Sequence, residues 1–181
     1  MATPLPDGIN RPWPPRAGGE GEMLLGFLDY QRATLAWKCG GLTDEQLRTA
    51  RPPSMVTLGG LLKHLASIED EWFTEIVAGQ PTPEPWASAD PEAAPGWAWT
   101  SAAEDSGKEL RDLWSERVER ARDVVAALIR DHGVAALDQT YAAWLGAVSL
   151  RWVILHMIEE YARHNGQADL IRESIDGQVG E

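Results

Sequence analysis

The sequence predicts an all-α protein, built as a four-helix bundle with long connections. Apolar residues recur at three- and four-residue spacing over four long stretches, which is the pattern of a helix with one buried face. No stretch alternates apolar and polar residues as a half-buried strand would, and there is no internal repeat. At 181 residues the chain is long enough for one well-buried core, so we expect a single domain spanning residues 1–181.

The first element is a proline-rich N-terminal arm, residues 1–19. Its five prolines exclude a helix or a central strand. Trp13, inside the rigid segment Arg11-Pro-Trp-Pro-Pro15, is expected to pack on the helical body, and disorder of the arm is the alternative. The first helix follows over about Glu20–Cys39, and Gly40-Gly41 ends it.

The remaining helices are delimited by capping residues. Thr43-Asp-Glu-Gln46 matches a capping box and predicts a short helical turn. The long helices are expected at about Thr57–Ala78, Lys108–Arg130 and Ser149–Ser174, with Thr57 and Ser149 as N-caps. Residues 79–105 form a long loop rich in proline and tryptophan, either a functional wall or an unstructured connection. Residues 134–148 are expected to be irregular.

The composition of the chain excludes several classes of partner and location. A net charge of -12 and a pI near 4.7 disfavour nucleic acid as a partner, because phosphate binding draws on clustered Lys and Arg. Charged residues interrupt every apolar stretch, so no membrane span is expected. The single cysteine, Cys39, excludes an internal disulfide and is expected to be a small buried hydrophobe. A cytoplasmic protein fits these features and the absence of an apolar leader.

Three potential metal ligands share one face of the last helix. His156, Glu160 and His164 lie at i, i+4 and i+8. The two histidines are separated by about 12 Å along the axis, whereas metal–nitrogen bonds are only about 2.1 Å, so one ion cannot take both. The candidate chelates are therefore His156 with Glu160, or Glu160 with His164.

Either chelate needs a further ligand, and His64 is the candidate. It lies on or beside the apolar stripe of the second long helix. Alone, such a histidine is typical of a hydrogen-bonded core residue. Two histidines and a carboxylate suit Zn²⁺ best, with Ni²⁺ or Fe²⁺ as alternatives, and three ligands leave positions open for water, thiol or substrate.

Four stretches of the chain are distinctive: Arg11–Pro15, Leu25–Arg32, Leu58–Leu65 and Glu159–Leu170. Together they resemble the DinB-like superfamily, and more narrowly its actinobacterial branch of mycothiol-dependent enzymes. Many relatives carry H-x-x-x-H-R-G-Q in the last helix, where this chain has Glu160-Tyr-Ala-Arg-His164-Asn-Gly-Gln167. This carboxylate version is similar to that of mycothiol-dependent maleylpyruvate isomerase.

The resemblance implies a metal bound by His64, Glu160 and His164. His156, Gln167 and Arg163 would then support these ligands or face the substrate, and Gly166 would let the last helix approach a neighbour closely. These residues lie on the same helix as two of the ligands.

The implied function is that of a divalent-metal-dependent thiol S-transferase, which activates a low-molecular-weight thiol, mycothiol, for attack on a small electrophile. The alternatives are a non-enzymatic metal-binding or stress-response protein, and a mycothiol-dependent isomerase or hydrolase with the same metal site. A homodimer is a further expectation that the resemblance raises.

Overall fold

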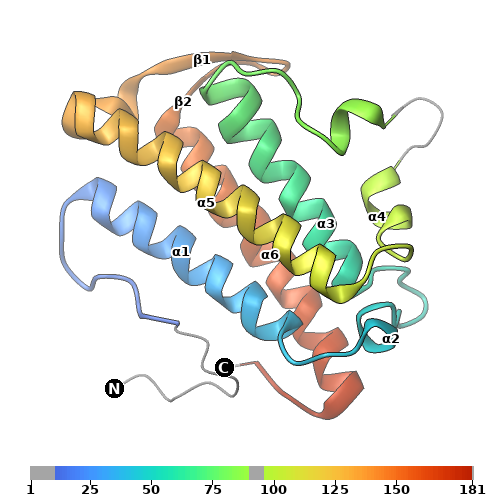
Figure 1. Cartoon of the computed structure of the whole chain (residues 1–181). Coiled ribbons are helices and arrows are strands. Elements are labelled where there is room, and N and C mark those ends of the chain that lie inside the picture. The colour runs from blue at the N-terminus through green and yellow to red at the C-terminus, as the bar shows by residue number, and fades with distance from the viewer. Residues whose placement is uncertain (1–10, 90–95, 181) are drawn as a thin grey trace.

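The fold is a bundle of four long helices, and it confirms the predicted all-α class. The computed structural model describes residues 11–89 and 96–180. In Figure 1, α1 lies along α6 and α3 lies along α5, while α3 also contacts α6. No helix in the described part of the chain is long and apolar enough to cross a membrane. The long helices are α1 (Glu20–Cys39), α3 (Leu58–Glu69), α5 (Gly107–His132) and α6 (Leu150–Asp176).

The helices begin where the capping residues predicted. The Thr57 hydroxyl accepts the Gly60 backbone N–H at 2.9 Å, and the Ser149 hydroxyl accepts that of Trp152 at 3.2 Å. Thr43 forms a capping box with Gln46 at the start of α2 (Asp44–Leu47). These side chains pair backbone donors that the first helical turn leaves without partners. The start of each of these helices is thus determined locally.

The second long helix keeps its predicted bounds but changes its hydrogen-bonding pattern halfway. After α3 the chain continues as a π-helix, η2 (Asp70–Val77). The buried Asp70 carboxylate accepts the Thr74 hydroxyl at 3.0 Å and the Trp86 indole N–H at 2.7 Å. Arg117 on α5 lies 2.6 Å from the same carboxylate. A π turn is wider than an α turn and is unusual over eight residues, and here a buried ion pair holds its start in place.

Residues 134–148 are not irregular, contrary to the prediction. They lie mostly in a short 3₁₀ helix, η4 (Gly133–Asp138), and an antiparallel hairpin of β1 (Thr140–Ala143) with β2 (Gly146–Ser149). Each strand has only four residues, and neither alternates apolar and polar residues. Gly146, at φ +116°, makes the tight reversal possible.

The long connection between η2 and α5 contains two short helices. They are η3 (Trp86–Ser88) and α4 (Trp97–Ser101), and α4 packs against α3. The Trp86 and Trp97 rings meet edge to face with centroids 6.0 Å apart. Residues 90–95 lie outside the described part of the chain. The tryptophans therefore order much of this connection against the bundle.

The described part of the N-terminal arm packs on α1. Residues 1–10 lie outside the described part, and Arg11–Gly19 contain no helix or strand. Trp13 stacks on Tyr30 of α1 with ring centroids 5.2 Å apart. The Arg11 guanidinium lies over the same tyrosine ring, 4.4 Å from its centroid. This agrees with the packed alternative for the Arg11–Pro15 segment.

A buried polar network joins all four long helices, with one residue from each: Arg32 (α1), Glu69 (α3), Trp114 (α5) and Tyr161 (α6). Arg32 donates twice to the Glu69 carboxylate, at 2.8 and 2.6 Å. The Tyr161 hydroxyl donates to Glu69 at 2.7 Å and accepts the Trp114 indole N–H at 2.9 Å. Buried charges persist in proteins when they are paired and hydrogen-bonded, as these are. The network therefore fixes the spacing of α3 and α6.

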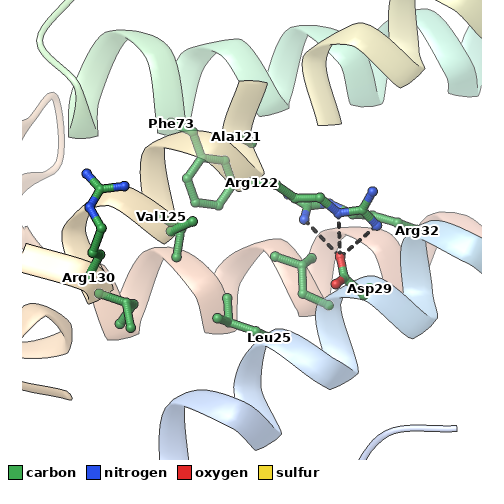
Figure 2. A pocket seen from close by; sticks show the side chains of 11 residues that line it. Leu25, Asp29, Arg32, Phe73, Ala121, Arg122, Val125 and Arg130 are labelled. Carbon is green, nitrogen blue, oxygen red and sulfur yellow. Dashed lines mark hydrogen bonds and ion pairs between the residues drawn. The ribbon is translucent and has the colours of Figure 1, made fainter. Parts of the chain in front are cut away.

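A separate cavity of about 460 Å³ opens between α1 and α5 (Figure 2). Its walls are mainly apolar and include Leu25, Phe73 and Val125. At one end Asp29 accepts hydrogen bonds from both Arg32 and Arg122, as the dashed lines in Figure 2 show. None of the predicted metal ligands lines this cavity.

Candidate metal centre

His64 on α3 and the pair Glu160 and His164 on α6 come together across the interface of the two helices. One ligand atom from each residue lies within 4.8 Å of the others. The His64 and His164 rings meet nearly perpendicular, with centroids 4.9 Å apart. His164 Nε2 lies 3.2 Å from Glu160 Oε2. The structure thus assembles the three residues that the family resemblance selected.

Trp99 of α4 covers His64, and its position depends on a glycine of α3. The Trp99 indole stacks on the His64 ring at 4.4 Å between centroids, with 24° between the planes. A Cβ on Gly60 would lie only 3.1 Å from the Trp99 ring, closer than side chains normally pack. Gly60 therefore leaves room for the indole. The sequence marked Trp99 only as one of several loop tryptophans.

Burial shapes the charge state of His64. Burial, together with the neighbouring His164, lowers the pKa of His64 to about 4. Near neutral pH the ring is therefore uncharged and has a free nitrogen lone pair. A neutral imidazole is the form that binds metal ions.

His164 is oriented by Gln167, one turn further along α6. His164 Nδ1 lies 2.8 Å from Gln167 Oε1. Because an amide oxygen only accepts hydrogen bonds, this contact places the ring proton on Nδ1. The Nε2 lone pair then faces the Glu160 carboxylate at 3.2 Å. Two acceptors this close favour a cation between them, so the donor set fits a divalent metal.

His156 lies on the same face of α6 but further from the centre. Its Nε2 is 4.0 Å from Glu160 Oε1, and its Nδ1 is 3.5 Å from Glu159. The ring is packed between two tryptophans, stacked on Trp152 at 5.0 Å and edge-on to Trp72 at 5.0 Å. His156, Glu159 and Glu160 form a second group with ligand atoms close together, all on one helix. The two oxygens of Glu160 thus face different histidines.

Arg163 and Gly166 lie on the outer side of α6. Arg163 donates to Glu159 at 2.7 Å, and its side chain is 65% exposed. Gly166 is exposed, and a Cβ placed there would meet nothing within 4 Å. The prediction that Gly166 lets α6 approach a neighbour closely is therefore wrong. The close approach beside the centre occurs at Gly60 instead.

Cys39 lies far inside the core and takes no part in the site. Its side chain is fully buried, with Sγ 3.9 Å from the Leu58 carbonyl. Burial raises the pKa of the Cys39 thiol to about 12, so almost no thiolate exists at neutral pH. This confirms that Cys39 is a small buried hydrophobe, and any thiol reacting at the centre must come from another molecule.

A cavity of about 270 Å³ adjoins His64. Its other described walls are the tryptophan-rich segments on either side of residues 90–95, including Trp86, Trp97 and Trp99. Among the described residues, no fourth His, Cys, Asp or Glu joins His64, Glu160 and His164. The fold and site therefore define a four-helix-bundle protein with a candidate three-ligand metal centre that adjoins a cavity.

Comparison with known families identifies the particular group. The family model described as mycothiol-S-transferase matches residues 23–177. No curated protein matches the chain. The match covers α3, α5, α6 and all but the first three residues of α1, and it includes the three candidate ligands. The chain belongs to the mycothiol-S-transferase family, a DinB-like family of actinobacterial mycothiol enzymes.

Proposed function

We propose that this protein is a divalent-metal-dependent mycothiol S-transferase, whose metal, Zn²⁺ by preference, is held by His64, Glu160 and His164. The observation that carries the proposal is the convergence of these three ligand atoms within 4.8 Å on two facing helices. The family match supports the thiol. A three-ligand site suits catalysis because it leaves a coordination position for a small molecule.

The chain's own residues prepare the centre for a thiol. Gln167 holds the proton of His164 on Nδ1, which leaves Nε2 free on the inner side. Trp99 shields one face of His64 from water. A bound divalent ion would favour the thiolate of mycothiol near neutral pH, whereas a free thiol has a pKa of about 8.5. The protein supplies orientation, while the sulfur comes from the cosubstrate.

The reaction is a substitution or addition at carbon. With a chloroacetamide as electrophile, a sulfur electron pair forms the C–S bond and chloride leaves with the C–Cl pair. The thiol proton passes to water. The products are a thioether, chloride and a proton, and no oxidant or reductant is required.

The proposal is tested by mixing zinc-loaded protein with mycothiol and a chloroacetamide, and following the thioether by mass spectrometry. We expect conjugate formation well above the uncatalysed rate, and its loss after treatment with a chelator. Glutathione in place of mycothiol tests the choice of thiol. No rate increase with any of several electrophile classes would contradict the transferase and favour a metal-binding protein without this activity.

A further inference from the structure

An aromatic platform borders the candidate metal centre. It consists of Trp72 on η2 together with Trp152 and His156 on α6. The Trp72 and Trp152 rings lie 5.3 Å apart between centroids, and His156 contacts both at 5.0 Å. Nothing in the family match assigns a role to this group.

The platform presents apolar surface to water. Trp152 is 38% exposed, and Trp144 at the tip of the hairpin is 80% exposed. The Trp144 indole N–H donates to Glu71 at 3.2 Å, which ties the hairpin tip to η2. A flat conjugated molecule stacked on Trp152 would remove both its own apolar area and that of the indole from water. The platform therefore favours aromatic ligands over small aliphatic ones.

The platform is within reach of the metal ligands. His156 Nε2 lies 4.0 Å from Glu160 Oε1. Trp152 precedes Glu160 by eight residues on α6, which is about 12 Å along a helix. A molecule about 12 Å long that rests on Trp152 can therefore extend along α6 toward the centre.

The surroundings of the platform are acidic. Glu71 on η2 lies close enough to Glu75, on its own helix, and to Glu160 on α6 to interact with both charges, and Arg163 is already paired with Glu159. Burial, and the negative charges of Glu75 and Glu160, raise the pKa of Glu71 although Trp144 donates to it. A bound metal ion would offset Glu160 but not the η2 carboxylates. An anionic ligand on the platform would meet repulsion.

Building on the proposed function, we propose that the electrophile is uncharged or cationic and has a flat conjugated body, which stacks on the exposed surface of Trp152. Its reacting carbon then faces the centre formed by His64, Glu160 and His164. Anionic substrates are disfavoured by Glu71 and Glu75.

Three chloroacetamides of equal chemistry test this inference, each used with mycothiol and zinc-loaded protein. They are 2-chloroacetanilide, the non-aromatic 2-chloro-N-ethylacetamide and the anionic 4-(2-chloroacetamido)benzoate. After subtraction of the uncatalysed rate, we expect kcat/KM for the anilide to exceed that for the ethylamide by about tenfold. The benzoate should fall below the anilide by about fivefold at low salt.

The variants assign these preferences to residues. Trp152→Ala should bring the ratio of anilide to ethylamide close to one, and Glu71→Gln should raise the benzoate toward the anilide. Leu155→Ala is the matched control, because Leu155 is an exposed apolar residue of the same helix outside the platform. It should change none of the three rates. Equal kcat/KM values for the three substrates in the wild type would overturn the inference. An anilide-to-ethylamide ratio that Trp152→Ala leaves unchanged would also overturn it.

Binding separates this inference from the proposed function. The unreactive analogues acetanilide, N-ethylacetamide and 4-acetamidobenzoate are compared by ligand-observed NMR on the same zinc-loaded protein. We expect acetanilide to bind best and to lose affinity in Trp152→Ala. If no chloroacetamide turns over but this binding order holds, the transferase fails and the aromatic site stands. If the chloroacetamides turn over but the binding order does not hold, the transferase stands and the aromatic site fails.

Discussion

The histidine cluster, formed by His64, Glu160 and His164, and the buried network share two helices, α3 and α6, but their polar groups are paired in opposite ways. In the network, the Glu69 carboxylate receives hydrogen bonds from both Arg32 and Tyr161. In the cluster, Glu160 Oε2 lies 3.2 Å from Nε2 of His164, which is an acceptor in the tautomer selected by Gln167. One group is closed by the protein itself, whereas the other has the donor set for a bound cation.

The difference indicates a division of labour along these helices. Polar groups that are buried and mutually paired hold elements together, because leaving any one of them alone in the core is costly. Polar groups that converge without donors at an accessible place are suited to a ligand. The network therefore holds α3 and α6 together, and the histidine cluster between the same helices is the proposed metal site.

The largest expected effect is the loss of metal from the variant His64→Ala/His164→Ala. Removing both imidazoles leaves Glu160 as the only remaining ligand, so we expect the metal content to fall from about one ion per chain to below about 0.1. Elemental analysis of protein purified without chelator measures it.

The control is His132→Ala, since His132 is exposed at the end of α5. It should keep the wild-type metal content. Equal metal in the double variant and the wild type would show that the cluster is not the site.

Breaking the network should instead reduce stability. In Glu69→Ala the buried Arg32 guanidinium loses its main partner, which we expect to cost about 3–5 kcal/mol of unfolding free energy. Urea denaturation of metal-free protein measures it, with the exposed Glu119→Ala as the control, expected to cost less than about 1 kcal/mol. Refolded Glu69→Ala should still bind metal, but more weakly than the wild type, because the spacing of α3 and α6 is no longer fixed. If Glu69→Ala is as stable as Glu119→Ala, the network does not hold the helices together.

Gln167→Ala is expected to have an intermediate effect. Without the amide oxygen, the ring of His164 loses the partner that selects its tautomer, and we expect metal affinity to fall about 10- to 100-fold. Competition with a colorimetric zinc chelator measures the affinity. Gln167→Glu, which keeps an acceptor oxygen in place, should retain most of it. Unchanged affinity in Gln167→Ala would mean that the contact does not orient the ligand.

The smallest effect on the metal is expected for His156→Ala. Because its ring is packed between Trp72 and Trp152, removing it should change zinc affinity by less than about twofold. The same chelator competition decides between the two chelates that the helical spacing allows. A drop comparable to that of His164→Ala would select His156 with Glu160.

The sequence predicted those parts of the fold that depend on local chemistry. The caps at Thr57 and Ser149 and the apolar stripes place the helices within two residues of their observed bounds. The pairing of Glu160 with His164 also follows from local structure, because both residues lie on one helix. The approach of His64 does not, because it depends on how α3 packs against α6. The family resemblance supplied this third ligand.

Tertiary contacts account for what the sequence did not predict. Trp99 stacks on His64 only because α4 packs over Gly60, and nothing in the surrounding loop signals that position. The π-helix at Asp70 has the same apolar spacing as a regular helix, so periodicity alone does not distinguish them. The hairpin was missed because its two strands are only four residues long and do not alternate apolar and polar residues.

X-ray absorption at the zinc edge, with and without mycothiol, tests the metal centre most directly. We predict two imidazole nitrogens and light-atom neighbours at about 2.0–2.2 Å, and a new sulfur at about 2.3 Å when mycothiol is added. The only cysteine of the chain is buried in the core, so such a sulfur must come from the added thiol. A zinc shell that gains no sulfur, or that already has four protein ligands, would contradict the proposed transferase.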